Sequence, residues 1–370
     1  MRTLTVLQLL PALEAGGVER STLEIAQALV ARGHRAVVIS EGGRLLPELL
    51  ATGAEHLAMP IGRKSLRTLR WVAPLRQALA RIAPDVVHVR SRMPAWVLRL
   101  ALRELPAPRP RVVSTVHGLN SPGFYSKIMT RADRVICVSQ SVHDYVLHHY
   151  PRTDPTRLRV IPRGIDPSHY PRGFVPSAQW QQSYAAQFPQ LQGGRLLLLP
   201  ARGTRLKGHR EAVNLLAALR ARGEDARLLL VGAVQRGRER YLAQIERHAQ
   251  ALGVRPWLAL TPPRADMREL YASADLVLQL SSKPESFGRT VLEALALGRP
   301  VLGWAHGGVG ELLHQLYPVG AVRLGDEPAL AEAAMGLLDC MPLAPANIPF
   351  TLAAMQDATL ALYQEVVGDD

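Results

Sequence analysis

The sequence predicts an α/β protein built from two doubly wound domains, each a parallel sheet with helices on both faces. Three observations lead to this fold class. Short β-branched and leucine-rich runs alternate with helical patterns along most of the chain. The alternation lapses once, near residues 163–194, and then restarts. A chain of 370 residues is also too long for one hydrophobic core and is enough for about two domains.

The first half of the chain alternates predicted strands with helical segments. The stretch Val18–Arg32 is the clearest helix, and Gly33 ends it. The predicted strands are Leu4–Leu10, Ala36–Ser40, Val86–Arg90, Val112–His117, Arg134–Ser139 and Leu158–Pro162. We expect residues 1–165 to form the first domain.

The lapse in the pattern has the composition of a linker. The stretch RGIDPSHYPRGFVPSAQW is rich in proline and glycine, which interrupt helices and strands. After it, strands are predicted at Leu196–Ala201, Arg227–Gly232, Trp257–Leu260, Leu276–Leu280 and Pro300–Trp304. Helices are predicted to begin at His209 and Phe287 and to span Arg238–Ala251 and Met267–Ala274. We expect residues 166–349 to form the second domain.

The alanine-rich tail from Glu327 to Asp370 is predicted to be helical, with a break at Met341-Pro342. We expect its last helix, about residues 350–370, to cross back to the first domain. In doubly wound sheets, ligands bind beyond the carboxyl ends of the strands. Two such domains that face one another across a cleft would direct both sets of strand ends at one ligand.

The composition narrows the class of protein. Apolar residues make up 48% and charged residues 20%, as in folded soluble proteins. No apolar stretch reaches the roughly 18–20 residues that span a bilayer. The opening run Leu4–Leu10 ends at Pro11, so we interpret it as a strand and not as a signal peptide. Cys137 and Cys340 are far apart, which excludes a disulfide framework or a zinc-ligand pair and fits a reducing cytoplasm.

Charge is distributed unevenly along the chain. Residues 1–165 contain 24 Lys/Arg and 11 Asp/Glu, whereas residues 166–370 contain 20 of each, so the net charge of +13 belongs to the first half. A basic half indicates an anionic partner, such as a membrane surface or a phosphorylated acceptor, although a surface that only promotes solubility would look the same. The signatures of nucleic-acid binding are absent, so we expect no nucleic-acid partner.

Two acids flank a predicted strand-to-helix loop. Glu285 follows the strand Leu276–Leu280, and Glu293 lies two helical turns later, hence on roughly the same side. Carboxylates accept hydrogen bonds from sugar hydroxyls, and a helix start attracts phosphate. Taken alone, the pair fits a solvated helix surface at least as well. It indicates a site for a phosphorylated sugar only if positive charge lies nearby.

Positive charge is available at another predicted strand end. Arg202 and Lys207 flank a turn after the strand Leu196–Ala201, where two cations can clamp a diphosphate. The turn lacks the glycine spacing of a Walker loop, and loop cations are often merely solvated.

Two further strand ends have residues suited to a ligand. Gly16-Gly17 follows the first strand, and paired glycines let a backbone approach a ligand closely, although the third glycine of a dinucleotide fingerprint is missing. His117 ends the strand Val112–His117 and can contact a substrate hydroxyl or serve a structural role.

Together, these motifs resemble those of glycosyltransferase family 4. Its members are retaining nucleotide-sugar transferases of the GT-B fold, with two Rossmann-like domains. The matches follow the family's order over nearly the whole chain: GGVER from Gly16, HG from His117, IPRGID from Ile161, Arg202 with Lys207-Gly208, ESFGRTVLEA from Glu285 and GGVGE from Gly307.

The resemblance implies a role for each matched residue of the second half. Arg202 and Lys207 would neutralise the donor diphosphate, which is the leaving group. Glu285 would hold hydroxyls of the donor sugar, and Glu293 would hold those of the ribose. Sugar and phosphate would also be supported by the backbone of Phe287, Gly288, Arg289 and Thr290. Arg264 ends the loop that meets the nucleobase in the family.

The resemblance also implies roles in the first half. His117 corresponds to the family's histidine near the reaction centre, and Gly16-Gly17 corresponds to the loop that borders diphosphate and acceptor. The implied catalytic residues are therefore His117, Arg202, Lys207 and Glu285, with Gly17 and His117 also contacting the acceptor. Members of the family need no bound metal, and no Asp-x-Asp occurs here, so we expect no metal or other cofactor. Arg289 and Arg163 depart from residues common in the family, and their roles stay open.

The basic first half indicates the class of acceptor. Residues 63–82 combine Arg and Lys with apolar residues, as in a helix lying on an anionic bilayer, interrupted by Pro74. A helix packed on the sheet with a solvated basic face fits equally well. Arg90-Ser91-Arg92 is expected to extend this basic surface.

We therefore expect transfer of a hexose from a nucleotide-sugar, in the first instance a UDP-sugar, to a lipid-linked or phosphorylated glycan such as lipopolysaccharide core. The expected location is the cytoplasmic face of the cytoplasmic membrane, as a peripheral protein. A transferase of the same fold with a soluble acceptor, or a sugar-binding relative without activity, stays open.

Overall fold

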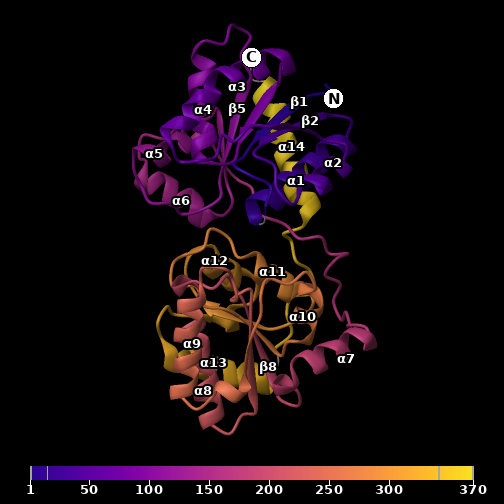
Figure 1. The fold of residues 1–370 in the computed structure, drawn as a ribbon, viewed down its shortest axis with the longest axis vertical. Helices are drawn as coiled ribbons and strands as arrows, with labels where there is room; N and C mark the ends of the chain where they lie inside the picture. Colours follow the sequence, from indigo (N-terminus) through magenta and orange to yellow (C-terminus); the bar gives the residue numbers. More distant parts are fainter. Residues whose placement is uncertain (1, 15, 341, 369–370) are drawn as a thin grey trace. The chain divides into compact units, whose positions relative to one another are not determined.

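The computed structural model describes residues 2–14, 16–340 and 342–368, which form two compact units (Figure 1). Unit 1 comprises residues 1–163 and 352–370, and unit 2 comprises residues 164–351. These limits lie within a few residues of the expected domain limits. Met341 of the expected helix break and the terminal Asp370 lie outside the described residues.

Unit 1 is built on a parallel sheet of seven described strands in the order β3-β2-β1-β4-β5-β6-β7. The strands are β1 Thr5–Leu9, β2 Arg35–Ser40, β3 Glu55–Ala58, β4 Val86–Val89, β5 Arg111–Val116, β6 Arg134–Cys137 and β7 Leu158–Val160. The pattern did not predict β3, because this edge strand has no buried apolar run.

Helices cover both faces of this sheet. Those described are α1 Gly17–Ala31, α2 Leu46–Ala51, α3 Val72–Ile82, α4 Arg92–Arg103, α5 Phe124–Lys127, α6 Gln140–His149 and α14 Leu352–Gly368, with the 3₁₀ turns η1 Leu66–Trp71, η2 Ile128–Thr130 and η3 Pro155–Arg157. The connections through α1 and α2 lead toward the β3 edge of the sheet, and those through α3 and α4 lead toward the β7 edge. Because all of these connections are right-handed, α1 and α2 lie on one face of the sheet and α3 and α4 on the other, as Figure 1 shows.

Unit 2 repeats the architecture with six described parallel strands in the order β10-β9-β8-β11-β12-β13. The strands are β8 Arg195–Pro200, β9 Ala226–Val231, β10 Leu258–Leu260, β11 Leu276–Gln279, β12 Val301–Trp304 and β13 Ala321–Val322. The helices are α7 Ala178–Gln187, α8 His209–Ala221, α9 Glu239–Ala251, α10 Met267–Ser273, α11 Arg289–Ala296, α12 Gly307–Leu316 and α13 Glu327–Cys340, with the 3₁₀ turns η4 Pro189–Leu191, η5 Arg205–Lys207, η6 Arg255–Trp257 and η7 Pro318–Gly320.

Two local predictions in unit 2 are wrong. The segment expected to be a linker contains α7, where Ser177 caps the amide of Trp180 and the Trp180 and Tyr184 rings stack at 5.0 Å. The helix expected from Phe287 begins at Arg289 instead, because Gly288 has φ 129°, a backbone conformation that stops the helix from starting earlier. The two-turn argument that linked Glu285 to Glu293 therefore does not apply.

Both sheets reverse their strand order once, between β1 and β4 in unit 1 and between β8 and β11 in unit 2. At such a reversal the two neighbouring loops leave toward opposite faces of the sheet, which opens a crevice at the strand ends. The loops that begin at Leu10, Arg90, Ala201 and Leu280 follow these four strands. Most of the predicted site residues therefore lie at the two reversals.

The central strands are buried on both faces and are apolar apart from a few polar positions. Val6, Leu7 and Leu9 of β1 are fully buried, as expected for a parallel sheet covered by helices. Gln8 of β1 and His88 of β4 are buried as well. Buried polar side chains must find hydrogen-bond partners, so these two positions mark a polar network inside unit 1.

The C-terminal helix α14 belongs to unit 1, where Figure 1 shows it in yellow beside α1. Its side chains Leu360, Tyr363 and Val366 are buried in the same core as β1 and α1. The Tyr363 hydroxyl lies 2.5 Å from Nδ1 of His88, whose Nε2 lies 2.6 Å from Oγ1 of Thr115. The helix is therefore attached to the sheet by a buried hydrogen bond as well as by apolar packing.

Replacing Tyr363 by Phe removes that hydroxyl and leaves Nδ1 of His88 buried without it. We expect the free energy of unfolding to fall by about 1–2 kcal/mol, since an orphaned buried polar group costs about this much. Urea denaturation of the whole chain measures the change. Ala361→Ser, at an exposed position of α14, is the matched control and should change the midpoint little; an equal effect of both substitutions would contradict the buried hydrogen bond.

Candidate active site

The carboxyl ends of β8 and β11 bring a lysine and a glutamate together. Lys207, at the end of η5, donates from Nζ to Oε1 of Glu285 across 2.5 Å. The two strands pair directly at the reversal of the sheet, so their loops lie side by side. The side chains are 25% and 23% exposed. The ion pair is thus reachable from solvent yet partly desolvated, which strengthens its electrostatic interaction.

A chain of polar contacts holds Glu285 in place. Ser281 contacts Oε1 of Glu285 through its hydroxyl, which also lies 3.1 Å from Oε1 of Gln279. Gln279, at the end of β11, donates from Nε2 to Oγ1 of Thr290 across 3.0 Å. His306 lies with Nε2 2.8 Å from the carbonyl oxygen of Ser281. The carboxylate is therefore oriented by the strand, by its loop and by the start of α11.

Close backbone contacts explain two of the glycine positions in the motifs. A Cβ on Gly208 would lie 2.1 Å from the carbonyl oxygen of Leu280, the residue before Ser281. A Cβ on Gly308 would lie 2.5 Å from Cα of Phe287, and the Gly308 amide donates to the carbonyl oxygen of Glu285 across 2.8 Å. Glycine at these positions lets the loops after β8 and β12 pack directly on the loop that contains Glu285.

Glu293 forms a second, more deeply buried cluster on α11. Arg289, one helical turn earlier, donates from Nε to Oε1 across 3.1 Å, and the Tyr271 hydroxyl donates to Oε2 across 2.9 Å. The glutamate side chain is only 13% exposed. Burial raises the pKa of Glu293 above its ordinary value, while Arg289 and Tyr271 oppose that shift. Arg289 therefore has a partner in the fold, the second predicted acid itself.

Some of the other predicted donor residues lie at the start of α11, and the rest lie on other loops. The buried Phe287 ring is roughly perpendicular to that of Phe350. Gly288 precedes the first residue of α11 and no side chain caps the helix, so backbone amides at the helix start have no side-chain acceptor. Arg202 is exposed on the loop after β8. Arg264 stands apart from the Lys207–Glu285 cluster in its contacts, because its guanidinium is held by Asp266 at 2.6 Å and 2.8 Å.

In unit 1, His117 follows β5 and contacts Arg163 through Nδ1. A guanidinium only donates, so Nδ1 accepts and the imidazole proton lies on Nε2. Burial, then the positive charges of Arg163 and Arg90, hold the pKa of His117 well below its ordinary range. His117 is therefore neutral at pH 7 and presents an N–H donor. Arg163, whose role the sequence left open, sets this tautomer.

The prediction that Arg90 extends a basic surface is wrong. Arg90 is 3% exposed, and its guanidinium donates to Oε1 of Gln8 at 2.8 Å and 2.6 Å and to Oγ of Ser21 at 2.8 Å. Burial lowers its pKa to about 10, so it keeps its charge at pH 7. The side chain turns inward because Gln8 of β1 and Ser21 of α1, both distant in the chain, supply hydrogen-bond acceptors there.

These side chains border a cavity of about 270 Å³ at the strand ends of unit 1. It extends from Val18, next to Gly17, past Arg90 and His117 to Tyr150. The Tyr150 hydroxyl oxygen is buried without a hydrogen-bond partner among the described residues. Gly17 has open space where a Cβ would be. An imidazole, a hydroxyl and a buried positive charge thus lie in or behind the wall of this cavity.

Two family models match the chain and cover most of both units. The model described as Glycosyltransferase Family 4 matches residues 15–169, and the model described as Glycosyl transferases group 1 matches residues 182–341.

The chain belongs to glycosyltransferase family 4.

The chain is 28% identical over 276 residues to the D-inositol 3-phosphate glycosyltransferase of Salinispora tropica, and the match covers 73% of this chain and 52% of that enzyme. It is 22% identical over 327 residues to the N-acetyl-alpha-D-glucosaminyl L-malate synthase of Bacillus anthracis, covering 85% and 82% of the two chains. The chain thus spans about half the length of the inositol-phosphate enzyme that it matches.

Solved structures confirm the predicted GT-B fold. A glycosyltransferase from Rickettsia africae superposes with a TM-score of 0.87 at 25% identity over 100% of both chains. Anabaena HepE, solved in complex with UDP and glucose, superposes with a TM-score of 0.76 at 22% identity over 98% of this chain and 95% of that one. WaaG, a glycosyltransferase involved in lipopolysaccharide biosynthesis, gives 0.69 at 20% identity over 98% of each chain.

The sequence did not predict several residues that surround Glu285, Glu293 and the cavity beside His117. Gln279, Tyr271 and Ser281 orient the two acids, and Arg90 and Tyr150 border the cavity of unit 1. One signal was available: Gln8, His88 and Gln279 are polar residues inside otherwise apolar predicted strands. Tyr150 and Tyr271 gave no such signal, because aromatic residues at helix positions are ordinary core residues.

In the described part of the chain, no group of three or more His, Cys, Asp or Glu side chains is arranged to hold a metal ion. No helix among the described residues is long and apolar enough to cross a membrane.

The buried histidines predict a pH dependence of stability. Burial lowers the pKa of His88 and of His117 well below the ordinary value of 6.5, so the folded state binds fewer protons than the unfolded state below that pH. We expect the free energy of unfolding to be unaffected by these groups above about pH 6.5 and to fall below it, by at most about 1.4 kcal/mol per pH unit for each histidine.

Urea denaturation between about pH 7 and about pH 5 measures the slope. His88→Asn should make it shallower, whereas His314→Asn, on α12 of unit 2, should leave it unchanged. A stability that stays constant over this range, or the same slope in both variants, would contradict a neutral buried His88.

Proposed function

We propose that this glycosyltransferase is a retaining, metal-independent hexosyltransferase that uses a nucleotide-sugar, in the first instance a UDP-sugar, and an acceptor hydroxyl on a lipid-linked or phosphorylated glycan. The observation that supports the donor half best is the Lys207–Glu285 pair beside the uncapped start of α11. It combines an ammonium for phosphate, a carboxylate for sugar hydroxyls and free helix amides in one place.

The donor diphosphate would replace Glu285 as the partner of Lys207. The exposed Arg202 on the same loop adds a second cation, and Glu285 is then available to accept hydrogen bonds from hydroxyls of the sugar. Departure of the nucleoside diphosphate breaks the anomeric C–O bond and concentrates negative charge on the phosphate. Preorganised positive charge stabilises that transition state without a metal. The acceptor oxygen bonds to the same face of the sugar and its proton passes to the leaving phosphate.

The ribose would be held by Glu293. Both of its oxygens already accept a hydrogen bond, from Arg289 and from Tyr271. Each carboxylate oxygen has two lone pairs, so ribose hydroxyls can donate to the remaining positions. The nucleobase would meet the backbone of the loop that Arg264 ends, since the Arg264 guanidinium is already occupied by Asp266.

The acceptor would occupy the cavity of unit 1. The N–H of His117 and the Tyr150 hydroxyl are placed to hydrogen-bond acceptor hydroxyls, and Gly17 leaves room for the ligand at the start of α1. A neutral His117 with its proton on Nε2 would donate a hydrogen bond to the acceptor hydroxyl and so hold it in position. It would not serve as a general base, which agrees with proton transfer to the leaving phosphate.

A soluble phosphorylated or acidic acceptor is the second candidate. The two relatives above are named for inositol 3-phosphate and L-malate, whereas WaaG is a glycosyltransferase involved in lipopolysaccharide biosynthesis. A sugar-binding relative without activity is disfavoured, because the ion pair and its supporting contacts are complete.

The surface of unit 1 favours a membrane-borne acceptor. In the segment expected to lie on a bilayer, α3 buries Leu75, Leu79 and Ile82 in the core, so this half is an ordinary packed helix. The first part of the segment, in η1, differs. Leu66 is 86% exposed, and the basic residues Arg67 and Arg70 follow it in the same turn. Phe124 of the adjoining α5 is 72% exposed. We define the membrane patch as Lys64, Leu66, Arg67, Leu69, Arg70 and Phe124. Lys64 joins its two segments, with Nζ 5.2 Å from the Tyr125 ring centroid.

Lys207→Ala removes the cation of the proposed donor site. We expect kcat to fall by about 100-fold or more, since a single group that stabilises the departing charge is worth this much, and KM for the donor to change less. The measurement is release of nucleoside diphosphate from a panel of UDP-, GDP- and ADP-sugars, with product NMR to give the acceptor hydroxyl and the anomeric configuration.

Arg205→Ala, an exposed cation two residues earlier, is the matched control and should keep near-normal turnover. Retention of configuration and full activity in EDTA are expected. Unchanged kcat in Lys207→Ala would remove the support for the donor site. A product with inverted anomeric configuration would contradict a retaining mechanism, and loss of activity in EDTA would contradict metal independence.

Leu66→Ser with Phe124→Ser should abolish pelleting with phosphatidylglycerol vesicles at low salt, because both side chains lose their contact with the bilayer. Leu50→Ser with Val160→Ser, which are exposed apolar positions of unit 1 outside the patch, should pellet like the unmodified protein. High salt should release all of these proteins. Absence of binding at low salt would contradict a peripheral position on the cytoplasmic face of the membrane.

A further inference from the structure

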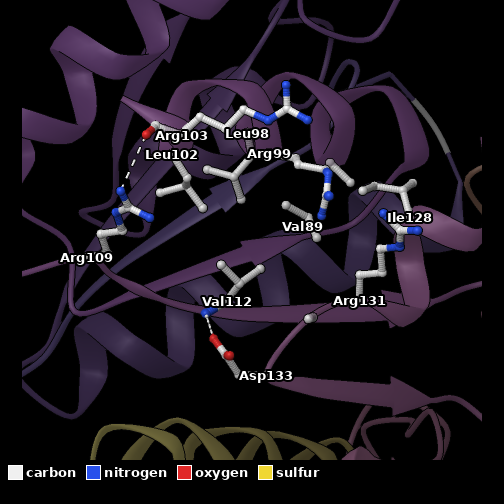
Figure 2. A pocket seen from close by; sticks show the side chains of 12 residues that line it. Val89, Leu98, Arg99, Leu102, Arg103, Arg109, Val112, Ile128, Arg131 and Asp133 are labelled. Atoms are coloured by element: carbon white, nitrogen blue, oxygen red, sulfur yellow. Dashed lines mark hydrogen bonds between the residues drawn. The ribbon is translucent and has the colours of Figure 1, made fainter. Parts of the chain in front are cut away.

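A second cavity of unit 1, of about 280 Å³, lies between α4 and the segment from η2 to the start of β6 (Figure 2). No residue lines both this cavity and the one beside His117. It is bordered by apolar side chains and by four arginines, and neither group has a role in the transfer proposed above.

The middle of the cavity is apolar. Leu98 and Leu102 of α4 are one helical turn apart, so they lie on the same helix face, and Figure 2 shows them directed toward Val112 of β5. Leu98 is 2% exposed and Val89, at the end of β4, is also 2% exposed. These side chains give the middle of the cavity an apolar wall against which an apolar ligand group can pack.

The ends of the cavity are positively charged. Figure 2 shows Arg99 and Arg131 extending toward the same end, beside Ile128, and Arg109 at the other end. Burial, followed by the charges of Arg131 and Arg103, lowers the pKa of the Arg99 guanidinium, which shows that like charges crowd there. Arg109 is held in place by its bonds to the carbonyl oxygens of Leu105 and Arg103.

The protein does not neutralise this charge itself. Within the described ranges, Arg99, Arg103, Arg109 and Arg131 form no ion pair with a carboxylate. The one acid that lines the cavity, Asp133, accepts the backbone amide of Val112 across 2.7 Å.

Glu104, next to Arg103 in the chain, pairs with Arg76 of α3 instead. Arg134 and Arg159 of the same unit, by contrast, both pair with Glu365. The unpaired charge at the cavity is therefore available to an anion from outside.

We propose that this cavity binds an anionic phospholipid, with the phosphate between Arg99 and Arg131 and the first part of an acyl chain against Leu98, Leu102 and Val112. Guanidinium forks match phosphate oxygens, and a purely polar ligand such as free phosphate or a sugar phosphate would leave the apolar wall of Leu98, Leu102 and Val112 without a partner. The net charge of +13 on this half of the chain matches an anionic lipid surface. The site is separate from the transfer site and does not rest on the proposed function.

The test uses the whole chain without donor and the short-chain lipid dihexanoyl phosphatidic acid, kept below its micelle concentration so that no bilayer is present. Calorimetric titration should give saturable binding at least about tenfold tighter than that of inorganic phosphate or of dihexanoyl phosphatidylcholine, because only the first probe fills both parts of the cavity. The dibutanoyl homologue should bind more weakly than the dihexanoyl lipid.

Two sets of variants separate charge from apolar contact. Arg99→Gln with Arg131→Gln should weaken binding of the dihexanoyl lipid by about tenfold or more. Arg81→Gln with Arg152→Gln removes the same charge from exposed positions of unit 1 outside the cavity, and should change it less than about twofold. Leu102→Gln should abolish the preference for the longer chain while leaving weak binding of inorganic phosphate unchanged.

Four outcomes would overturn the site. They are no saturable binding of the lipid, equal affinity for inorganic phosphate, equal affinity for the zwitterionic lipid, and equal losses in the two arginine pairs. Nucleoside diphosphate release, measured on the same variants with a soluble acceptor, should stay near normal, so failure of this proposal and failure of the proposed function give different results.

Discussion

Helices on both faces of each parallel sheet impose the constraint on which the rest of this protein depends. A strand that is covered on both faces has no side chain left for a ligand, and its backbone groups are used by its neighbours. Chemistry is therefore confined to the loops at the carboxyl ends of the strands. The two strand reversals, β1/β4 and β8/β11, place four such loops beside one another in pairs. Gln8 and Gln279 interrupt the apolar strands and support residues beyond the strand ends, Arg90 and Thr290, whereas His88 joins β5 to α14.

In unit 1 the buried polar residues include Arg90, whose guanidinium stays positively charged at pH 7. Arg90 is kept ionised in the core by Gln8 and Ser21, and its charge helps to keep His117 neutral. His88 connects the same region to Tyr363 of α14. The last helix of the chain is thus attached at the level of the site, and not only by the apolar core of α1.

Unit 2 differs, because its loop cation Lys207 is paired with an acid. The ion pair with Glu285 lowers the cost of holding a partly buried lysine at the strand ends. Glycines at 208 and 308 bring the neighbouring loops into backbone contact with the Glu285 loop. The arginines around Leu98 and Leu102 differ, since within the described ranges none of them forms an ion pair with a carboxylate. Lys207 and these arginines are therefore cations in two different electrostatic settings.

The amino-acid sequence by itself determined the fold class, the two-domain division and the loops that contain Arg202, Lys207, Glu285 and His117, because strand–helix alternation and motif order are local properties. It also marked α14 as a separate last helix. Only the tertiary structure decided which of the distant residues meet: Lys207 with Glu285, and Arg163 with His117. Only the fold turned Arg90 inward, started α11 at Arg289 and placed Tyr150 on a cavity. The physical reason is that contact between residues distant in the chain depends on strand order and helix packing, which leave no trace in residue spacing.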